Sequence, residues 1–103
     1  MTIELTQAYF VDEGLSFSLS QLTQHSGLSE EEIQALVESG AFSPADPRAA
    51  YWRFDAHCVI VARNARRVRD EFALADAHSL AVVLRLLQRI QTLEENLKRL
   101  GER

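Results

Sequence analysis

The sequence lacks several features that would assign it to a compartment or a membrane. Its 103 residues include one cysteine, Cys58, which excludes an internal disulfide and is typical of a protein from a reducing compartment. No apolar run approaches the ~18 residues that span a membrane. The start, Met1–Glu4, has neither the basic residues nor the apolar stretch of a secretory signal. We therefore expect a single cytoplasmic domain with one modest core.

Sequence motifs for catalysis are also missing. We find no glycine-rich phosphate loop, no nucleophile motif and no pair of carboxylates that would form a cleft, so we expect no enzymatic activity and no cofactor. His57 and Cys58 are adjacent on an expected helix and therefore diverge, and no second cysteine or HxxxH spacing accompanies them. We predict that the protein has no metal site and that Cys58 is a small core residue.

Basic residues are absent from residues 1–47. Residues 1–50 contain eight acidic residues and one basic residue, Arg48, whereas residues 51–103 contain seven acidic and ten basic residues. Such asymmetry affects the choice of partner and the rate of association rather than the fold. Because DNA binding depends on neutralising phosphates with Lys and Arg, the acidic half favours a basic partner.

The pattern of the first half predicts short elements around a turn. Residues 3–10 alternate as a short strand, and Leu15–Phe17 is either its return strand or an extended lead-in. Ser18 should cap a helix over Leu19–His25. Residues 41–54, with two prolines and an aromatic-rich end, should form a small β hairpin, the wing of a winged helix-turn-helix.

The helix from Ser29 to about Ser39 is the best-specified element. Ser29 and Glu32 have the spacing of a capping box, and Gly40 can end the helix in a left-handed conformation. Ile33 begins an apolar face with the i, i+3, i+4 spacing of an amphipathic helix. The fold is therefore predicted to be mostly α.

Two longer helices complete the predicted fold. The third should begin after Asp55 and end near Phe72, with a buried stripe made of Cys58, Val61, Ala65, Val68 and Phe72. The last should begin near Asp76. Its heptad-spaced apolar residues predict a homodimer, and they are Val83, Leu86, Ile90, Leu93, Leu97 and Leu100. A second apolar row widens the apolar face over the first half of this helix and consists of Leu80, Leu84 and Leu87. The first half should therefore pack on the domain, while the narrower second half projects.

Several charged and aromatic residues have two interpretations. Glu32 fits the capping box as well as it fits a partner, but that box does not need Glu30 or Glu31, and Glu38 lies where the helix dipole disfavours an acid. Trp52 and Phe54 either anchor the wing or bind a partner. One basic cluster consists of Arg63, Arg66, Arg67 and Arg69. These arginines could contact phosphates. We favour the alternative that they form a solvated face, with two of them paired to Asp70 and Glu71 at i,i+4.

Four segments of the chain suggest a family: Phe17–Ser20, His25–Ile33, Trp52–Asp55 and Arg66–Leu74. They resemble the family of the bacterial chaperone modulator CbpM, a small relative of MerR-type regulators, and they occur in the order expected of that family. The resemblance runs from about Phe17 to Leu100. It implies a MerR-like fold, with residues 1–74 as a partner-binding domain and residues 75–103 as a dimerisation helix, together one compact unit.

The resemblance also implies a function. Members of the family bind the J-domain of the DnaJ-like co-chaperone CbpA, block its stimulation of the Hsp70 chaperone DnaK and reduce its DNA binding. A J-domain presents a basic helix to Hsp70, and an acidic face would complement it. The residues that we expect to contact the partner are Glu30, Glu31, Gln34 and Glu38, with Trp52 and Arg53 as a second group.

Two alternatives to this function are open. A MerR-type transcriptional regulator would place the helix from Ser29 to Ser39 in a major groove and use Arg48, Arg53 and the arginines of the third helix on the phosphates. A dimeric adaptor for another basic protein is the second alternative. The lack of Lys and Arg before Arg48 counts against the transcriptional regulator.

Overall fold

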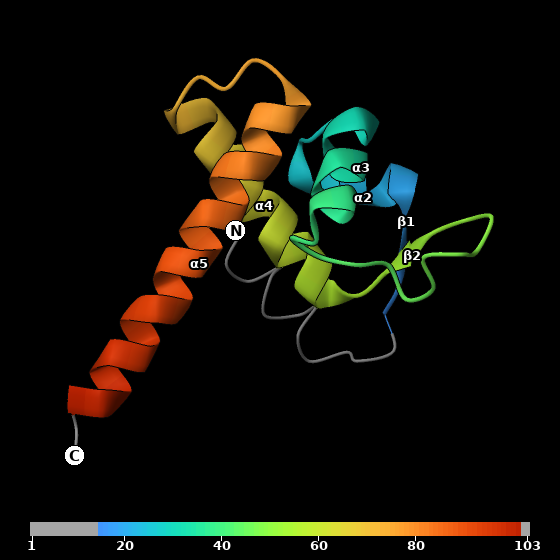
Figure 1. The fold of residues 1–103 in the computed structure, drawn as a ribbon. Coiled ribbons are helices and arrows are strands. Elements are labelled where there is room, and N and C mark those ends of the chain that lie inside the picture. The colour runs from blue at the N-terminus through green and yellow to red at the C-terminus, as the bar shows by residue number, and fades with distance from the viewer. Residues whose placement is uncertain (1–14, 102–103) are drawn as a thin grey trace.

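The structure is a computed structural model that describes residues 15–101, in which four helices and a two-stranded sheet share one core (Figure 1). The elements, in chain order, are β1 (Phe17–Ser18), α2 (Leu19–Ser26), α3 (Glu30–Ser39), β2 (Arg53–Phe54), α4 (Ala56–Glu71) and α5 (Ala77–Gly101). The predicted mostly α fold is confirmed. The strand predicted over residues 3–10 lies outside the described residues.

The helices begin at the predicted caps. The hydroxyl of Ser18 accepts from the backbone N–H of Gln21 at 3.1 Å, and the Ser18 N–H donates to the Gln21 side chain at 2.8 Å. Ser29 forms the same capping box at the start of α3, and the Asp55 carboxylate caps α4. These bonds satisfy backbone N–H groups that a helix start leaves without partners.

The small antiparallel sheet is present, but its strands differ from the predicted hairpin. β1 pairs with β2, so that Phe17 lies opposite Phe54 and Ser18 opposite Arg53. The rest of residues 41–54 forms a loop rather than a second strand. The physical reason is burial, because the β1–β2 pairing brings Phe17 and Phe54, exposed by 5% and 0%, into the same core.

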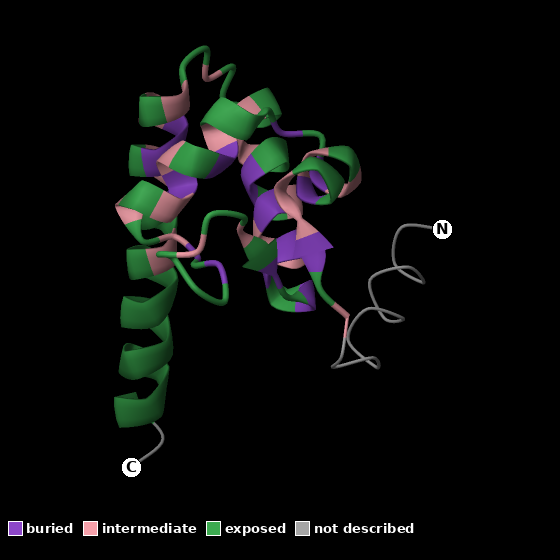
Figure 2. Ribbon diagram, turned by 90° about the vertical axis from the view of Figure 1, so that its right-hand side faces the viewer, coloured by how far each residue is buried: buried purple, intermediate pink, exposed green. Residues whose placement is uncertain are grey.

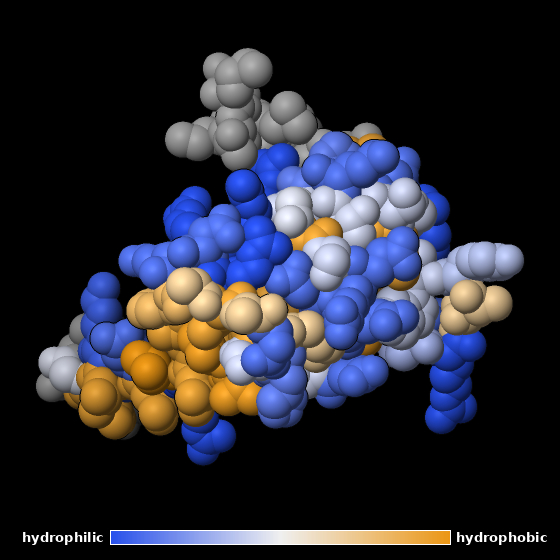
Figure 3. All heavy atoms as spheres, turned by 90° about the horizontal axis from the view of Figure 1, so that it is seen from above, coloured by the Kyte–Doolittle hydropathy of each residue, from blue (hydrophilic) through white to orange (hydrophobic). Residues whose placement is uncertain are grey.

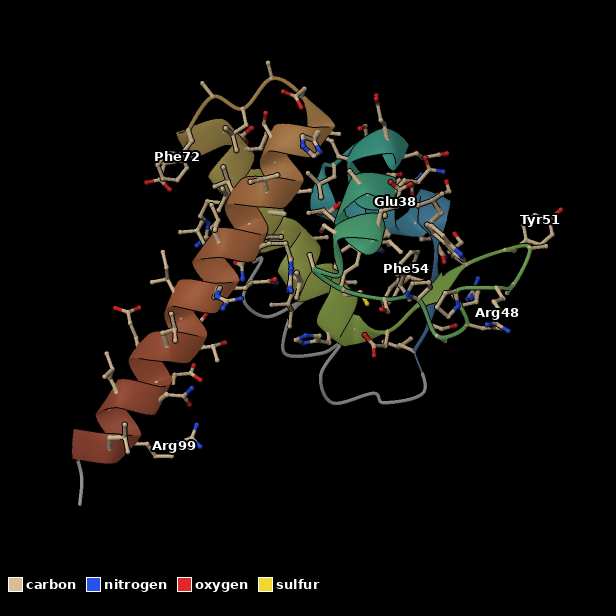
Figure 4. All side chains as sticks on the ribbon, viewed as in Figure 1. Glu38, Arg48, Tyr51, Phe54, Phe72 and Arg99 are labelled. Atoms are coloured by element: carbon tan, nitrogen blue, oxygen red, sulfur yellow. The ribbon has the colours of Figure 1, made fainter. Side chains whose placement is uncertain are left out.

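The core contains residues from every helix, and buried residues are coloured purple in Figure 2. Its largest fully buried side chains are Phe54, Leu22, Ile33, Leu36, Leu80, Val59 and Cys58. The predicted buried stripe of α4 is confirmed at Cys58 and Ala65 but is wrong at Phe72, which is 57% exposed. Phe72 follows the last residue of α4, where the chain turns, and its ring points away from the body (Figure 4).

α5 has two distinct halves. Its first half packs against α3 and buries Leu80, Ala81 and Leu84, although Leu87 is exposed. Every residue from 91 to 100 is exposed, and this half extends away from the other elements (Figures 1 and 2). The prediction that the second half projects is therefore confirmed. None of the helices within residues 15–101 offers an apolar stretch that would reach across a membrane.

Candidate partner-binding surface

The exposed side of α3 is fixed by the residues that bury the other side. Ile33 and Leu36 are fully buried, and Gly40, with φ of 84°, ends the helix. The residues left in solvent are the four that the sequence analysis assigns to a partner, and we call them the acidic face: Glu30, Glu31, Gln34 and Glu38.

Glu32 differs from its two acidic neighbours. Its carboxylate Oε1 accepts from the backbone N–H of Ser29 at 2.9 Å and from the guanidinium Nη1 of Arg69 at 2.9 Å. Its side chain is only 14% exposed. The carboxylate of Glu32 is therefore engaged in the capping box and in the ion pair to α4. These contacts explain the residue at this position without a binding partner.

The acidic face differs from Glu32 in its contacts with the described part of the chain. Within residues 15–101, no hydrogen bond or ion pair engages the side chains of Glu30, Glu31, Gln34 or Glu38. Acids in the first turn of a helix are favoured by its dipole, but Glu38 lies in the last turn, which has no basic residue. The face thus presents three carboxylates that make no ion pair with the described part of the chain.

Two grooves flank the acidic face. The α3–α5 groove has a volume of about 740 Å³, and its α3 side includes Glu31, Gln34 and Glu38, while its α5 side includes Ala81, Val82 and Leu86. The α3–Trp52 groove has a volume of about 520 Å³ and includes Leu19, Glu30, Gln34, Tyr51 and Trp52. Gln34 lines both grooves, so the acidic face forms the ridge between them.

The structure gives Trp52 and Arg53, the second group of predicted contact residues, different surroundings. Trp52 lines a groove with Glu30, and its position is fixed by an Nε1–H bond to the Pro47 carbonyl at 3.2 Å and an edge contact with Phe54. Arg53 lines neither groove, because its guanidinium donates to the Ser16 hydroxyl at 2.8 Å and carbonyl at 3.1 Å. Trp52 therefore shares a surface with the acidic face, whereas Arg53 ties β2 to the segment before β1.

Sequence reasoning missed the residues that α5 contributes to the surface. Ala81, Val82, Arg85 and Leu86 line the α3–α5 groove, and Tyr51, which is 86% exposed, lines the other. Tyr51 lies at the outer tip of its loop (Figure 4). The heptad spacing of the last helix was the available signal for Leu86, whereas Val82 belongs to neither of the two apolar rows predicted for that helix.

The arginines of α4 line neither groove, and most of them bind their own chain. Arg66 pairs with Asp70 at 3.5 Å, as predicted, but Arg67 and Glu71 do not form the second predicted pair. The Nε–H of Arg63 donates to the His25 carbonyl at 3.0 Å. Together with the Glu32 contact of Arg69, these bonds favour a structural role for most of the cluster.

A continuous apolar ridge follows the outer side of α5. We call it the α5 ridge; it begins at the half-buried Val83 and continues with five exposed side chains, Leu86, Ile90, Leu93, Leu97 and Leu100. Their exposed fractions range from 52% to 68%. Figure 3 shows apolar side chains gathered along one side of the molecule. Monomeric soluble proteins seldom expose apolar patches of this kind without an interaction to match.

The residues that the structure describes show no metal-binding arrangement. Over residues 15–101, no three His, Cys, Asp or Glu side chains gather around a position where an ion could be held. Cys58 is buried, and its Sγ lies 3.5 Å from the Ser43 carbonyl oxygen. The predicted core role of Cys58 is confirmed.

Comparison with known proteins gives two results. Residues 17–102 match the family described as MerR HTH family regulatory protein. The chain is 34% identical over 93 residues to the chaperone modulatory protein CbpM of Citrobacter koseri, and the aligned region covers 90% of this chain and 91% of the relative. It is 35% identical over 89 residues to the protein of the same name from Escherichia coli O1:K1, with coverage of 86% and 87%.

Proposed function

The chain belongs to the MerR HTH regulatory family and to the CbpM chaperone modulatory proteins, and we propose the following mode of action for it. It binds the J-domain of a DnaJ-like co-chaperone of the CbpA type through the acidic face of α3. By covering the basic helix that the J-domain presents to Hsp70, it inhibits the co-chaperone's action on DnaK and its binding to DNA. It acts in the cytoplasm as a binding protein and not as an enzyme.

The observation that supports this proposal is the state of the three carboxylates of Glu30, Glu31 and Glu38. They are exposed on one helix and make no ion pair within the described residues. Opposite potentials on two surfaces steer encounter and select the partner. A basic helix is therefore the surface that the acidic face complements, and competition with Hsp70 for that helix is a sufficient mechanism of inhibition.

The proposal includes a homodimer formed through the α5 ridge. The ridge has heptad spacing, and its members from Leu86 onward are exposed. A heptad seam is buried when a second helix of the same kind packs on it. The α5 ridge of a second copy can pack against this ridge, and the two copies would then be related by a two-fold axis.

DNA binding is the competing function, and the MerR family match is the observation that favours it. In that family's mode of binding, a helix enters the major groove and arginines contact the phosphates. Here the corresponding helix begins with Glu30, Glu31 and Glu32, and Arg53 and Arg69 bind their own chain. These contacts support the J-domain proposal over DNA binding.

The test is a titration of the purified protein with an isolated J-domain at about 0.05 M and 0.2 M salt, with random duplex DNA in parallel. We expect binding to the J-domain that weakens with salt, because exposed charges are screened over ~10 Å at 0.1 M salt. Binding to DNA alone would contradict the proposal. Salt-insensitive binding to the J-domain would contradict the role of the acidic face.

A further inference from the structure

The α3–Trp52 groove differs in chemistry from the groove on the other side of the acidic face. Among the described residues that line it, Glu30 is the one charged residue, and Tyr51 and Trp52 supply two aromatic side chains. The α3–α5 groove instead includes the basic Arg85 and has no tryptophan, tyrosine or phenylalanine among its described lining residues. A carboxylate beside aromatic rings, with no competing base, suits a cation that has a flat apolar surface.

Trp52 is held in place by its own chain. Its Nε1–H donates to the Pro47 carbonyl at 3.2 Å, and its ring makes a T-shaped contact with Phe54, with ring centroids 6.1 Å apart. Phe54 is fully buried, so this contact ties the indole to the core. Because the N–H is already bonded, Trp52 offers the groove the apolar carbons of its ring. A ring fixed in this way loses little conformational entropy when a ligand packs on it.

The α3 side of the groove supplies hydrogen-bond acceptors. Glu30 and Gln34 both line it, and they are exposed and one turn apart on the helix. Within residues 15–101 neither side chain makes a hydrogen bond or an ion pair. An arginine guanidinium has five N–H donors in one plane and no acceptor, and its edge can pair with a carboxylate through two parallel bonds. The groove therefore combines acceptors for the edge of a guanidinium with an aromatic surface for its face.

We infer that the α3–Trp52 groove binds one arginine side chain of the protein partner, whose guanidinium packs on the Trp52 ring and pairs with the Glu30 carboxylate. The groove volume of about 520 Å³ is in the range of pockets that hold a small ligand, ~300–1,000 Å³. Arginine is favoured over lysine because a guanidinium is planar, is more weakly hydrated than an ammonium and stacks on aromatic faces. The inference rests on the proposed function for the source of the arginine, a basic partner at the acidic face, and not for the chemistry of the groove.

The groove adds selectivity to a surface that otherwise recognises charge. The exposed carboxylates of the acidic face attract lysine and arginine alike. A pocket that requires stacking as well as charge distinguishes the two side chains. A basic partner with arginine at the matching position therefore binds more tightly than one with lysine there.

The first experiment uses Trp52 as the reporter. It is the sole tryptophan of the chain, so the fluorescence of the unlabelled protein reports on this groove. The probe is N-acetyl-arginine amide, titrated at constant ionic strength beside N-acetyl-lysine amide and the uncharged N-acetyl-citrulline amide. We expect a saturable change with a dissociation constant of ~1–10 mM for the arginine probe. The lysine probe should bind at least ~5-fold more weakly, and the citrulline probe should show no saturable binding.

Two variants that make the same change in net charge test the role of Glu30. Glu30→Gln removes the carboxylate and keeps the size of the side chain, and it should weaken binding of the arginine probe by at least ~5-fold. Glu71→Gln removes an exposed carboxylate of α4 that does not line the groove, and the affinity should stay within about twofold of the wild type. Equal effects of the two variants, or equal affinities of the arginine and lysine probes, would overturn the arginine pocket.

The second experiment tests whether the partner supplies the arginine. At about ten times its dissociation constant, N-acetyl-arginine amide should weaken J-domain binding at least ~3-fold more than N-acetyl-lysine amide does at the same concentration and ionic strength. Equal weakening by the two probes would overturn the assignment of the pocket to an arginine of the partner. Failure of the wild-type protein to bind the J-domain would overturn the proposed function and this source of the arginine, whereas the fluorescence titration by itself decides the chemistry of the groove.

Discussion

The carboxylate of Glu32 lies 2.9 Å from the guanidinium Nη1 of Arg69, and this ion pair joins the start of α3 to α4. The two residues are 37 positions apart in the sequence. The same carboxylate oxygen accepts from the Ser29 N–H. One of three consecutive glutamates thus holds the helix in place, while Glu30 and Glu31 remain in solvent at its first turn.

The first prediction concerns the different roles of these glutamates. Glu32→Ala should lower the free energy of unfolding by about 1–2 kcal/mol, because it removes the side-chain bond from Glu32 to the Ser29 N–H and a partly buried ion pair. Glu31→Ala should change that free energy by less than about 0.5 kcal/mol. Urea unfolding of both variants at one protein concentration measures the difference, and equal losses would show that Glu32 has no special structural role.

A second prediction compares two glycines with nearly the same backbone conformation. Gly27 and Gly40 have φ of 82° and 84°, so alanine at either position is strained, by about 1–3 kcal/mol. A Cβ at Gly27 would also lie 2.9 Å from Arg66 Cδ, whereas a Cβ at Gly40 would meet nothing within 4 Å. The Arg66 side chain is long and 56% exposed, so it can move aside at little cost, and we expect Gly27→Ala and Gly40→Ala to lower the melting temperature by similar amounts. A much larger loss for Gly27→Ala would show that Arg66 cannot move away from the α2–α3 turn.

The local elements could be predicted because the residues that specify them are neighbours in the sequence. Ser18 and Ser29 find their capping partners three residues later, and Gly40 ends α3 by its own backbone freedom. The heptad spacing of the last helix likewise predicted that its second half would lie outside the core.

Contacts between distant residues could not be predicted in the same way. The pairing of Phe17 with Phe54, the Arg53–Ser16 bonds and the Glu32–Arg69 pair all join segments far apart in the chain. The 3–4 spacing placed Phe72 in the stripe of α4, but the helix ends one residue earlier. The acidic face was predicted, whereas its α5 border required the packing of α5 on α3.

A third prediction concerns pH. Burial raises the pKa of the Cys58 thiol to about 12, and Asp55 adds to this effect, compared with an ordinary value of 9.0. The unfolded chain therefore releases this proton at lower pH than the folded protein. The stability contributed by the buried thiol is complete below pH 9.0 and is lost as pH rises towards 12.

The measurable consequence is the slope of the free energy of unfolding against pH. Between those pH values the free energy of unfolding should fall by about 1.4 kcal/mol per pH unit more steeply in the wild type than in Cys58→Ala. The comparison uses slopes because the substitution also leaves a small cavity. Equal slopes, or rapid reaction of the native thiol with a thiol reagent at pH 8, would contradict the burial of Cys58.

A fourth prediction separates Trp52 from Arg53. Trp52 borders the groove that contains Glu30, so we expect Trp52→Ala to weaken J-domain binding by about 5–10-fold. Arg53→Ala should mainly lower the free energy of unfolding, by about 1 kcal/mol, because its bonds to Ser16 are lost. Isothermal titration and urea unfolding of both variants give the comparison, and a larger binding loss for Arg53→Ala would assign the partner contact to that residue instead.

Charge reversal on α3 tests whether its acidic face binds the basic surface of a J-domain. The measurement is the dissociation constant of the J-domain complex for Glu30→Lys/Glu31→Lys, beside Glu71→Lys/Glu95→Lys, which makes the same change in net charge on α4 and α5. We expect the first variant to weaken binding by at least ~10-fold at low salt and the second to change it by less than about twofold. Equal effects of the two variants, or tighter binding by Glu30→Lys/Glu31→Lys, would show that the J-domain does not bind through the acidic face.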